Sequence, residues 1–193
     1  EEAMKNKNRG GAGIIAIIAV VVVIAIFFGG QWNNLVKLDE DVNGAWAQVQ
    51  NQVKRRADLI PNIVETVKGY AGHEKETFTE ITKARAGVTE ASTPKELAEA
   101  NDNLTEAISR LNVVVENYPE LKANQNFLDL QAQLEGTENR IATERMRYNE
   151  TVKTYNQKVR RFPTNIIAKI LGFGPRDYFK VSEKDNQVPE VKF

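Results

Sequence analysis

The fold class is decided by residues 127–162, which read FLDLQAQLEGTENRIATERMRYNETVKTYNQKVRRF. Large apolar side chains recur in this stretch at every seventh position, namely Phe127, Leu134, Ile141, Tyr148, Tyr155 and Phe162. A seven-residue apolar repeat is typical of α-helices that pack against partner helices in a left-handed supercoil. The stretch therefore predicts a long helix over about 120–162.

A second helix is predicted over about 94–116, because its start carries a clear signal. Thr93 suits the N-cap, Pro94 the first helical position and Glu96 the third, and together they make a capping box. Side chains of this type satisfy the backbone N–H groups that a helix start leaves unpaired. The chain should therefore turn just before Thr93.

The first long helix is predicted over about 31–91, where apolar residues recur three or four positions apart. Pro61 lies inside it and should kink it, because proline lacks a backbone donor and crowds the preceding turn. Gly72 is expected to weaken the helix without ending it, since the apolar spacing keeps its phase on both sides. A compact four-helix bundle that turns at Gly69–Gly72 is the alternative.

The predicted helix lengths match one another. At about 1.5 Å per residue, the first helix rises about 90 Å and the two later helices return about 100 Å. No alternating polar and apolar run bounded by turn residues indicates a strand. We therefore predict an all-α fold, a long antiparallel helical hairpin or bundle with coiled-coil-like seams over 31–162. A short helix and an extended tail should follow over 163–193.

The apolar stripes supply the residues expected to pack helices together or to mediate self-association. These are Trp46, Ile60, Pro61, Val64, Leu104, Leu111, Phe127, Leu134, Ile141, Tyr148, Tyr155 and Phe162. Charged residues interrupt the same faces and predict ion pairs that fix the register between helices, at some cost in stability. These are Arg56, Asp58, Glu138 and Arg145.

A small repeat, Tyr148-Asn149 and Tyr155-Asn156, lies one heptad apart. One interpretation is a ladder of side chains presented to a partner. The other, which we favour, is that tyrosine fills the packing face while asparagine caps or hydrogen-bonds across helices.

Composition changes abruptly near the N-terminus, where residues 10–30 carry no charge and residues 14–28 are all apolar. Twenty-one helical residues span about 31 Å, the thickness of the hydrocarbon core. A buried core helix would keep a polar stripe, and a cleaved signal peptide would want small residues after the run. We therefore predict a tail over 1–10 and an uncleaved transmembrane helix over 11–30. The residues expected in the bilayer or at its interface are Ile14, Ile18, Val22, Ile26, Phe28 and Trp32.

Flanking charges predict the orientation of this helix. Lys5, Lys7 and Arg9 precede the apolar run, whereas only Lys37 follows it closely. By the positive-inside rule, the N-terminus is cytoplasmic and the helical domain lies outside the bacterial inner membrane, in the periplasm. Met4 has the look of a natural start, with residues 1–3 as an upstream extension.

The short C-terminal helix also bears on the membrane. If the chain returns to the anchor, the apolar side chains of this helix could insert into the bilayer interface. These are Ile166, Ile167, Ile170, Leu171 and Phe173. The alternative, which we favour on sequence alone, is that this helix caps the open end of the bundle.

Composition excludes much chemistry from the 193 residues. There is no cysteine for a thiolate or disulfide, and the single histidine, His73, cannot build a His-rich metal site. Outside residues 1–30 the chain carries 23 basic and 24 acidic residues, which argues against nucleic-acid binding. Short basic clusters, such as Lys54-Arg55-Arg56 and Arg160-Arg161, are expected to be solvated. We predict no cofactor, no metal site and no catalytic residues.

Three motifs together resemble the LemA family of bacterial membrane proteins. They are RADLIPNIVETVKGYA at 56–71, ERMRYN at 144–149 and Phe162-Pro163. The resemblance covers nearly the whole chain. It implies an all-helical domain on one transmembrane helix, with no established enzymatic activity, cofactor or catalytic residue.

The sequence thus predicts a non-enzymatic, membrane-anchored helical scaffold that self-assembles at the bacterial envelope as a homo-oligomer. The candidate partners are the lipid bilayer and a membrane protein. The alternative is an adaptor or accessory subunit that docks to an envelope protease, a transporter or another membrane complex. An enzyme is the least favoured possibility, and it would need a pocket around Glu138 or Glu144.

Overall fold

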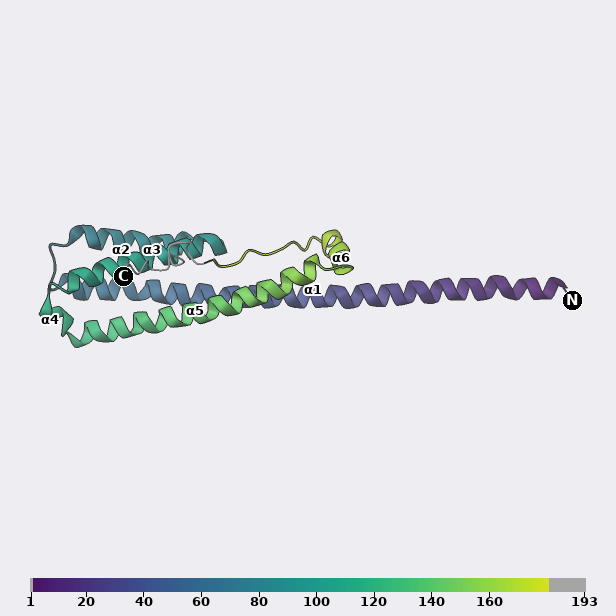
Figure 1. Cartoon of the computed structure of the whole chain (residues 1–193), viewed down its shortest axis with the longest axis horizontal. Helices are drawn as coiled ribbons and strands as arrows, with labels where there is room; N and C mark the ends of the chain where they lie inside the picture. Colours follow the sequence, from purple (N-terminus) through teal and green to yellow (C-terminus); the bar gives the residue numbers. More distant parts are fainter. Residues whose placement is uncertain (1, 181–193) are drawn as a thin grey trace, which may run out of the picture. The chain divides into compact units, whose positions relative to one another are not determined.

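The computed structural model describes residues 2–180, with side chains described from residue 13 onward, and every regular element in this part of the chain is a helix (Figure 1). The all-α prediction is confirmed. The helices are α1 (Glu2–Lys68), α2 (Lys75–Glu90), α3 (Pro94–Val115), α4 (Pro119–Lys122), α5 (Gln125–Arg160) and α6 (Thr164–Ile170).

Two compact units divide the described chain. The anchor unit comprises residues 2–41 and 153–176, and the bundle unit comprises residues 42–152 and 177–180. Helices α1 and α5 each contribute to both units, whereas α2, α3 and α4 belong to the bundle unit and α6 to the anchor unit.

The predicted single helix over 31–91 is wrong, because α1 ends at Lys68 and α2 begins at Lys75. The carbonyl of Val67 accepts hydrogen bonds from the N–H groups of Tyr70 (3.0 Å) and Ala71 (2.8 Å), which closes the end of α1. Glycine lowers helix propensity by about 1 kcal/mol, and two glycines lie within this connection. The turn at Gly69–Gly72 that the alternative predicted is therefore present.

Helix α2 runs back along α1 within the bundle unit. The Nε of Arg85 on α2 donates to the carbonyl of Ala57 on α1 (3.1 Å). The two residues lie at similar distances along the chain from the turn that joins these helices. Helices α2 and α3 then pack against each other after the short connection at residues 91–93. The short helix α4 follows α3, and residues 123–124 separate it from α5. Helix α5 therefore begins at Gln125 rather than at about 120.

The apolar stripes of α3 and α5 face the interior of their own chain. Most of the predicted packing residues are buried, namely Ile60, Val64, Leu104, Leu111, Phe127, Leu134, Ile141, Tyr148 and Tyr155. Trp46 and Pro61 are half-buried, and α1 continues through Pro61 as one helix. The large side chains that the repeat supplies thus pack in the core of their own chain.

Phe162 is the exception, with 75% of its surface exposed. Its predicted packing role is wrong because α5 ends at Arg160, two residues before the last member of the repeat. Pro163 follows directly, and the residue before a proline is disfavoured in helical conformation. The final apolar residue therefore lies beyond the helix face that carries the other five.

The apolar run of α1 is exposed along its described length. Ile14, Ile18, Val22, Ile26, Phe28 and Trp32 all present large apolar surfaces. In the described part of the chain, α1 is the one helix long and apolar enough to cross a membrane. This exposure fits a membrane anchor and does not fit the alternative of a buried core helix.

The capping box at the start of α3 forms as the sequence predicts. Thr93 Oγ1 accepts from the N–H of Glu96 (3.2 Å), and the Glu96 carboxylate accepts from the N–H groups of Ser92 (2.9 Å) and Thr93 (3.1 Å). The hydrogen bonds from the Ser92 backbone and side chain, and then from the Thr93 backbone, lower the pKa of Glu96 below its usual value.

Removing this box should weaken the bundle unit measurably. We expect Thr93→Ala to lower the free energy of unfolding by about 1 kcal/mol, because the helix start loses a side-chain acceptor. Thr143→Ala, an exposed mid-helix change, should stay within about 0.5 kcal/mol. Urea unfolding of the detergent-solubilised chain, followed by circular dichroism, measures both, and equal losses would contradict the assignment.

The same box makes stability depend on pH. Because the folded pKa of Glu96 is lowered, its contribution is full above the usual glutamate pKa of 4.5 and is lost as the pH falls through the folded value. We expect Glu96→Gln to reduce the loss of stability in this acid range and to leave the slope at higher pH unchanged.

Candidate functional site

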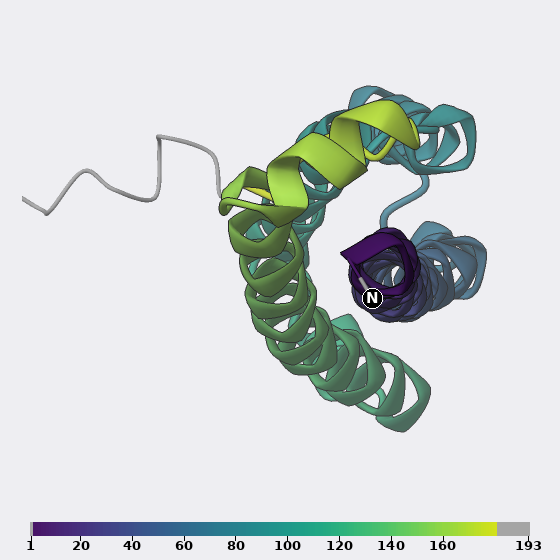
Figure 2. The same ribbon diagram turned by 90° about the vertical axis from the view of Figure 1, so that its right-hand side faces the viewer.

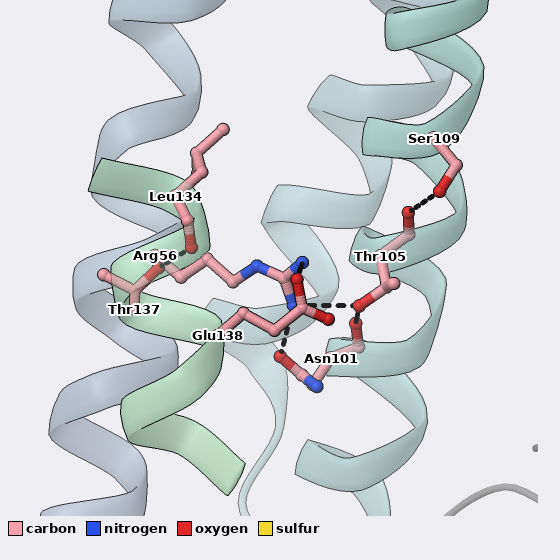
Figure 3. Close-up of polar contacts among 7 residues, drawn as sticks. All are labelled: Arg56, Asn101, Thr105, Ser109, Leu134, Thr137 and Glu138. Atoms are coloured by element: carbon pink, nitrogen blue, oxygen red, sulfur yellow. Dashed lines mark hydrogen bonds and ion pairs between the residues drawn. The ribbon is translucent and has the colours of Figure 1, made fainter. Parts of the chain in front are cut away.

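A buried arginine joins three helices in the bundle unit (Figure 3). Arg56 on α1 is 2% exposed, and its Nη1 donates to Asn101 Oδ1 (3.1 Å) and Thr105 Oγ1 (2.8 Å) on α3. Its Nη2 lies 3.6 Å from Glu138 Oε2 on α5. Burial lowers the pKa of Arg56, and the carboxylates of Glu138 and Asp102 oppose this effect. The guanidinium nevertheless stays charged, because arginine does not deprotonate in proteins.

The structure brings together two of the four residues predicted to fix the register. Arg56 and Glu138 form an ion pair, whereas neither Asp58 nor Arg145 has an ion pair among the described residues. Asp58 is exposed because two residues along a helix correspond to about 200°, which places it opposite Arg56. On α5 it is Arg147 that lies near Glu144, at 3.4 Å. The predicted network is therefore wrong for Asp58 and Arg145.

Both tyrosines of the Tyr-Asn repeat are buried, as the favoured interpretation predicts, whereas the asparagines have a role that neither interpretation anticipated. In the anchor unit, Asn156 Oδ1 accepts from the N–H of Arg176 (2.7 Å) while its Nδ2 donates to the carbonyl of the same residue (2.9 Å). In the bundle unit, Asn149 makes the same pair of bonds to Phe179, both at 2.9 Å. We call these the two Asn clamps. Each asparagine binds an extended C-terminal segment rather than another helix.

Aromatic side chains accompany each clamp. In the bundle unit, Tyr148 donates to the carbonyl of Asp177 (2.7 Å) and packs against Trp46, with ring centroids 5.5 Å apart. The buried ring of Phe179 lies 6.5 Å from the same tryptophan. Sequence periodicity could place the tyrosines on the buried face, but no local signal identifies a contact with residues about 30 positions away.

The anchor unit has its own polar contact beside the clamp. Arg176 Nη2 donates to Asp39 Oδ1 (2.6 Å), an ion pair between the C-terminal segment and α1. Burial, followed by the nearby charge of Asp39, raises the pKa of the Tyr155 hydroxyl. This group therefore stays protonated at neutral pH and acts as a neutral packing and hydrogen-bonding residue.

An open groove of about 790 Å³ lies between α2 and α3 on the bundle unit. Its lining includes several small residues, namely Ala84, Gly87, Ala91, Ala100 and Ala107. Five glutamates line it as well, namely Glu80, Glu90, Glu96, Glu99 and Glu106. Two basic residues, Lys83 and Arg110, complete the charged lining, which is therefore acidic. Arg110 bridges Glu80 (2.7 Å) and Glu106 (2.9 Å).

The acidic lining of the groove suits it to binding a basic surface. A general acid working near neutral pH needs a raised carboxyl pKa, whereas that of Glu96 is lowered. Glu138, the residue that an enzymatic interpretation would use, does not line the groove and is 57% exposed. His73 lies in the turn before α2, and no cluster of three potential metal ligands occurs in the described part of the chain.

The C-terminal helix contacts α1 directly after the apolar run. Thr164 Oγ1 donates to Gln31 Oε1 (3.2 Å), and the rings of Phe173 and Trp32 meet edge to face at 6.0 Å. Of the residues predicted to be interfacial, Ile167 is buried and Phe173 half-buried. The exposed ones are Ile166, Ile170 and Leu171.

Comparison with known proteins adds a family and several relatives. Residues 45–193 match the model of the LemA family. Magnetosome protein MamQ 2 of Paramagnetospirillum magneticum is 26% identical over 208 residues, which cover 93% of this chain and 76% of that protein. Protein LemA of Metamycoplasma hominis is 28% identical over 174 residues, covering 86% and 78%. Magnetosome protein MamQ of Magnetospirillum gryphiswaldense is 24% identical over 207 residues, covering 93% and 76%.

Proposed function

Because this chain belongs to the LemA family, we propose that it is a non-enzymatic, membrane-anchored helical scaffold whose copies assemble side by side at the bacterial envelope. The exposed apolar helix and the membership together fit a membrane-anchored protein. Two surfaces of the bundle unit support self-assembly. One is the acidic groove between α2 and α3, and the other is a basic patch at the same level along the helices.

The basic patch is Lys54 and Arg55 on α1, and both side chains are exposed. Arg56, the next residue, binds Asn101 and Thr105 on α3, so the patch is level with this part of α3. Glu99 and Asn103 line the groove at the same level. The basic patch and the acidic groove of one bundle unit therefore lie at the same level along its helices.

Equal heights matter because copies anchored by the same transmembrane segment stand parallel. We infer that the patch of one copy contacts the groove of its neighbour at the same level, where opposite charges attract. Groove against groove would bring glutamates together, an arrangement that like-charge repulsion disfavours. An interface between two different surfaces produces rings or open rows rather than a closed two-fold dimer.

Cysteine crosslinking tests this arrangement directly, since the chain has no cysteine of its own. We expect a Lys54→Cys chain and an Asn103→Cys chain, mixed in one membrane, to be joined by a short bis-maleimide. Thr143→Cys, an exposed position on α5, serves as the matched partner that should not react. Equal crosslinking of both pairs, or none with Asn103→Cys, would contradict the interface.

Charge reversal gives an independent measurement of the same contact. Lys54→Glu alone and Glu99→Lys alone should each lower the mass of the detergent-solubilised particle in light scattering, and a mixture of the two variants should recover it. Lys75→Glu makes the same charge change outside the patch and should leave the mass unaltered. A strictly monomeric wild-type chain at all concentrations would contradict self-assembly.

The accessory-subunit alternative has its own outcome in these experiments. If Lys54→Cys crosslinks in stoichiometric amount to one envelope enzyme and not to Asn103→Cys, the first helix serves a partner docked on it. Recovery of self-contacts alone favours the scaffold.

We also propose that the chain resides in the inner membrane with a cytoplasmic N-terminus and an extracytoplasmic helical domain. Lys5, Lys7 and Arg9 before the apolar run, against Lys37 after it, support this orientation. A membrane-impermeant maleimide added to intact cells with a permeabilised outer membrane should label Lys54→Cys. Labelling that requires disruption of the inner membrane would reverse the orientation.

A further inference from the structure

Helix α6 has one buried and one exposed apolar face. Ile167 and Ala168 are buried, whereas Ile166 is 49% and Ile170 is 72% exposed. Phe162, just before the helix, is also exposed. Helix α6 lies across the direction of α5 within the anchor unit (Figure 2). The buried face caps the unit, and the outer face has no protein partner among the described residues.

The exposed face adjoins the membrane-spanning part of α1. A cleft of about 230 Å³ lies between the two helices, lined by Phe28, Gly29, Trp32, Ile167, Ile170 and Leu171. Its lining is almost entirely apolar. Phe28 ends the apolar run, and Trp32 lies where an aromatic side chain of a spanning helix meets the headgroups. Helix α6 is therefore held at the edge of the hydrocarbon core.

The C-terminal segment of the anchor unit is basic. Residues 153–176 contain six basic residues and no acidic residue. Arg176 is paired with Asp39. Arg160, Arg161 and Lys169 are exposed and have no ion pair among the described residues. Basic side chains beside exposed apolar ones at a membrane surface are the pattern that binds anionic lipid.

We propose that α6 and Phe162 form an interfacial membrane-binding element for anionic phospholipids. Phe162, Ile166 and Ile170 insert among the acyl chains beside α1, and an acyl segment fills the cleft. Arg160, Arg161 and Lys169 bind the phosphate groups of the headgroups. Arg160 and Arg161 are exposed, as the sequence predicts, and the proposal adds that lipid headgroups bind them.

A lipid surface fits this face better than a second copy does. The apolar face continues onto the exposed surface of α1 at Phe28 and Trp32, which the bilayer covers. Two copies meeting here would place like charges from Arg160, Arg161 and Lys169 against each other. Anionic headgroups instead neutralise them.

The test uses the full chain with a fluorophore on Asn165→Cys, an exposed polar position of α6. The chain is reconstituted in phosphatidylcholine nanodiscs, with or without phosphatidylglycerol. We expect a spin label just below the headgroup to quench the fluorophore more than aqueous iodide does, and phosphatidylglycerol to increase this quenching. For Lys169→Gln, the phosphatidylglycerol fraction needed for half-maximal quenching should rise about fivefold.

Ile166→Ser with Ile170→Ser should abolish lipid quenching, and the leucine pair Ile166→Leu with Ile170→Leu should restore it. Val113→Ser, which removes a 69% exposed apolar side chain on α3, is the matched control and should change nothing. Preferential quenching by iodide would overturn the proposal, as would protection from both quenchers, which indicates a protein cover. Lipid quenching that ignores phosphatidylglycerol would overturn the headgroup assignment.

Discussion

Arg56→Ala should lower the free energy of unfolding of the bundle unit by about 3 kcal/mol, one of the two largest effects that we expect of a single substitution. The change removes a long buried side chain and leaves Asn101 Oδ1 without its charged donor. Glu138 is not left buried, because it is 57% exposed, and this keeps the loss at the lower end of values for broken buried pairs.

Matched variants separate burial from charge in this cluster. Glu138→Gln should cost less than about 1 kcal/mol, since an exposed partner contributes little. Asp58→Asn, on the opposite side of α1, should stay within about 0.5 kcal/mol. Arg56→Met fills most of the space without the hydrogen bonds and should fall between alanine and wild type. Denaturant unfolding in detergent measures the series, and equal losses for Arg56→Ala and Asp58→Asn would contradict the structure.

The second large effect is expected at the Asn clamps. Asn156→Ala removes two hydrogen bonds to Arg176, worth about 1 kcal/mol each, so the Arg176 amide should exchange with solvent about 30-fold faster. Asn149→Ala should do the same for the Phe179 amide. Hydrogen exchange of the full chain, read by mass spectrometry on C-terminal peptides, measures both.

The chemistry of the clamp gives a sharper variant. Asn156→Asp keeps an acceptor for the Arg176 N–H but loses the donor to its carbonyl, so we expect an intermediate increase in exchange. Asn126→Ala, on an exposed side chain that contacts Thr66, is the control and should leave both amides protected. Rapid exchange of these amides in the wild-type chain would contradict the clamps.

Local patterns predicted much of the fold. The seven-residue repeat identifies the buried face of α5 because the spacing of residues along one helix fixes which of them share a face. The capping box identifies the start of α3 because its contacts join residues that are neighbours in the sequence. The end of α1 was missed because the buried Ala71 keeps the apolar spacing in phase through the turn, as Phe78 and Ile81 do beyond it. Periodicity alone does not distinguish a continuous helix from two helices that share a core.

The candidate site depends on contacts that sequence spacing does not contain. Arg56 and Glu138 were expected to pair, but so were Asp58 and Arg145, and only the rotation of each helix separates these cases. The role of Asn149 and Asn156 requires knowing where an extended segment lies, which no periodic pattern records. The groove arises where alanines and a glycine of α2 and α3 meet, a feature of two helices together.

Five of the six apolar residues of the seven-residue repeat are buried in the core of their own chain. Each polypeptide completes its hydrophobic interior by itself, before it meets a neighbour. If copies associate laterally as we propose, a copy would join or leave the array without exposing buried apolar side chains. Turnover of the array would then proceed subunit by subunit, with no need for chaperone-assisted unfolding.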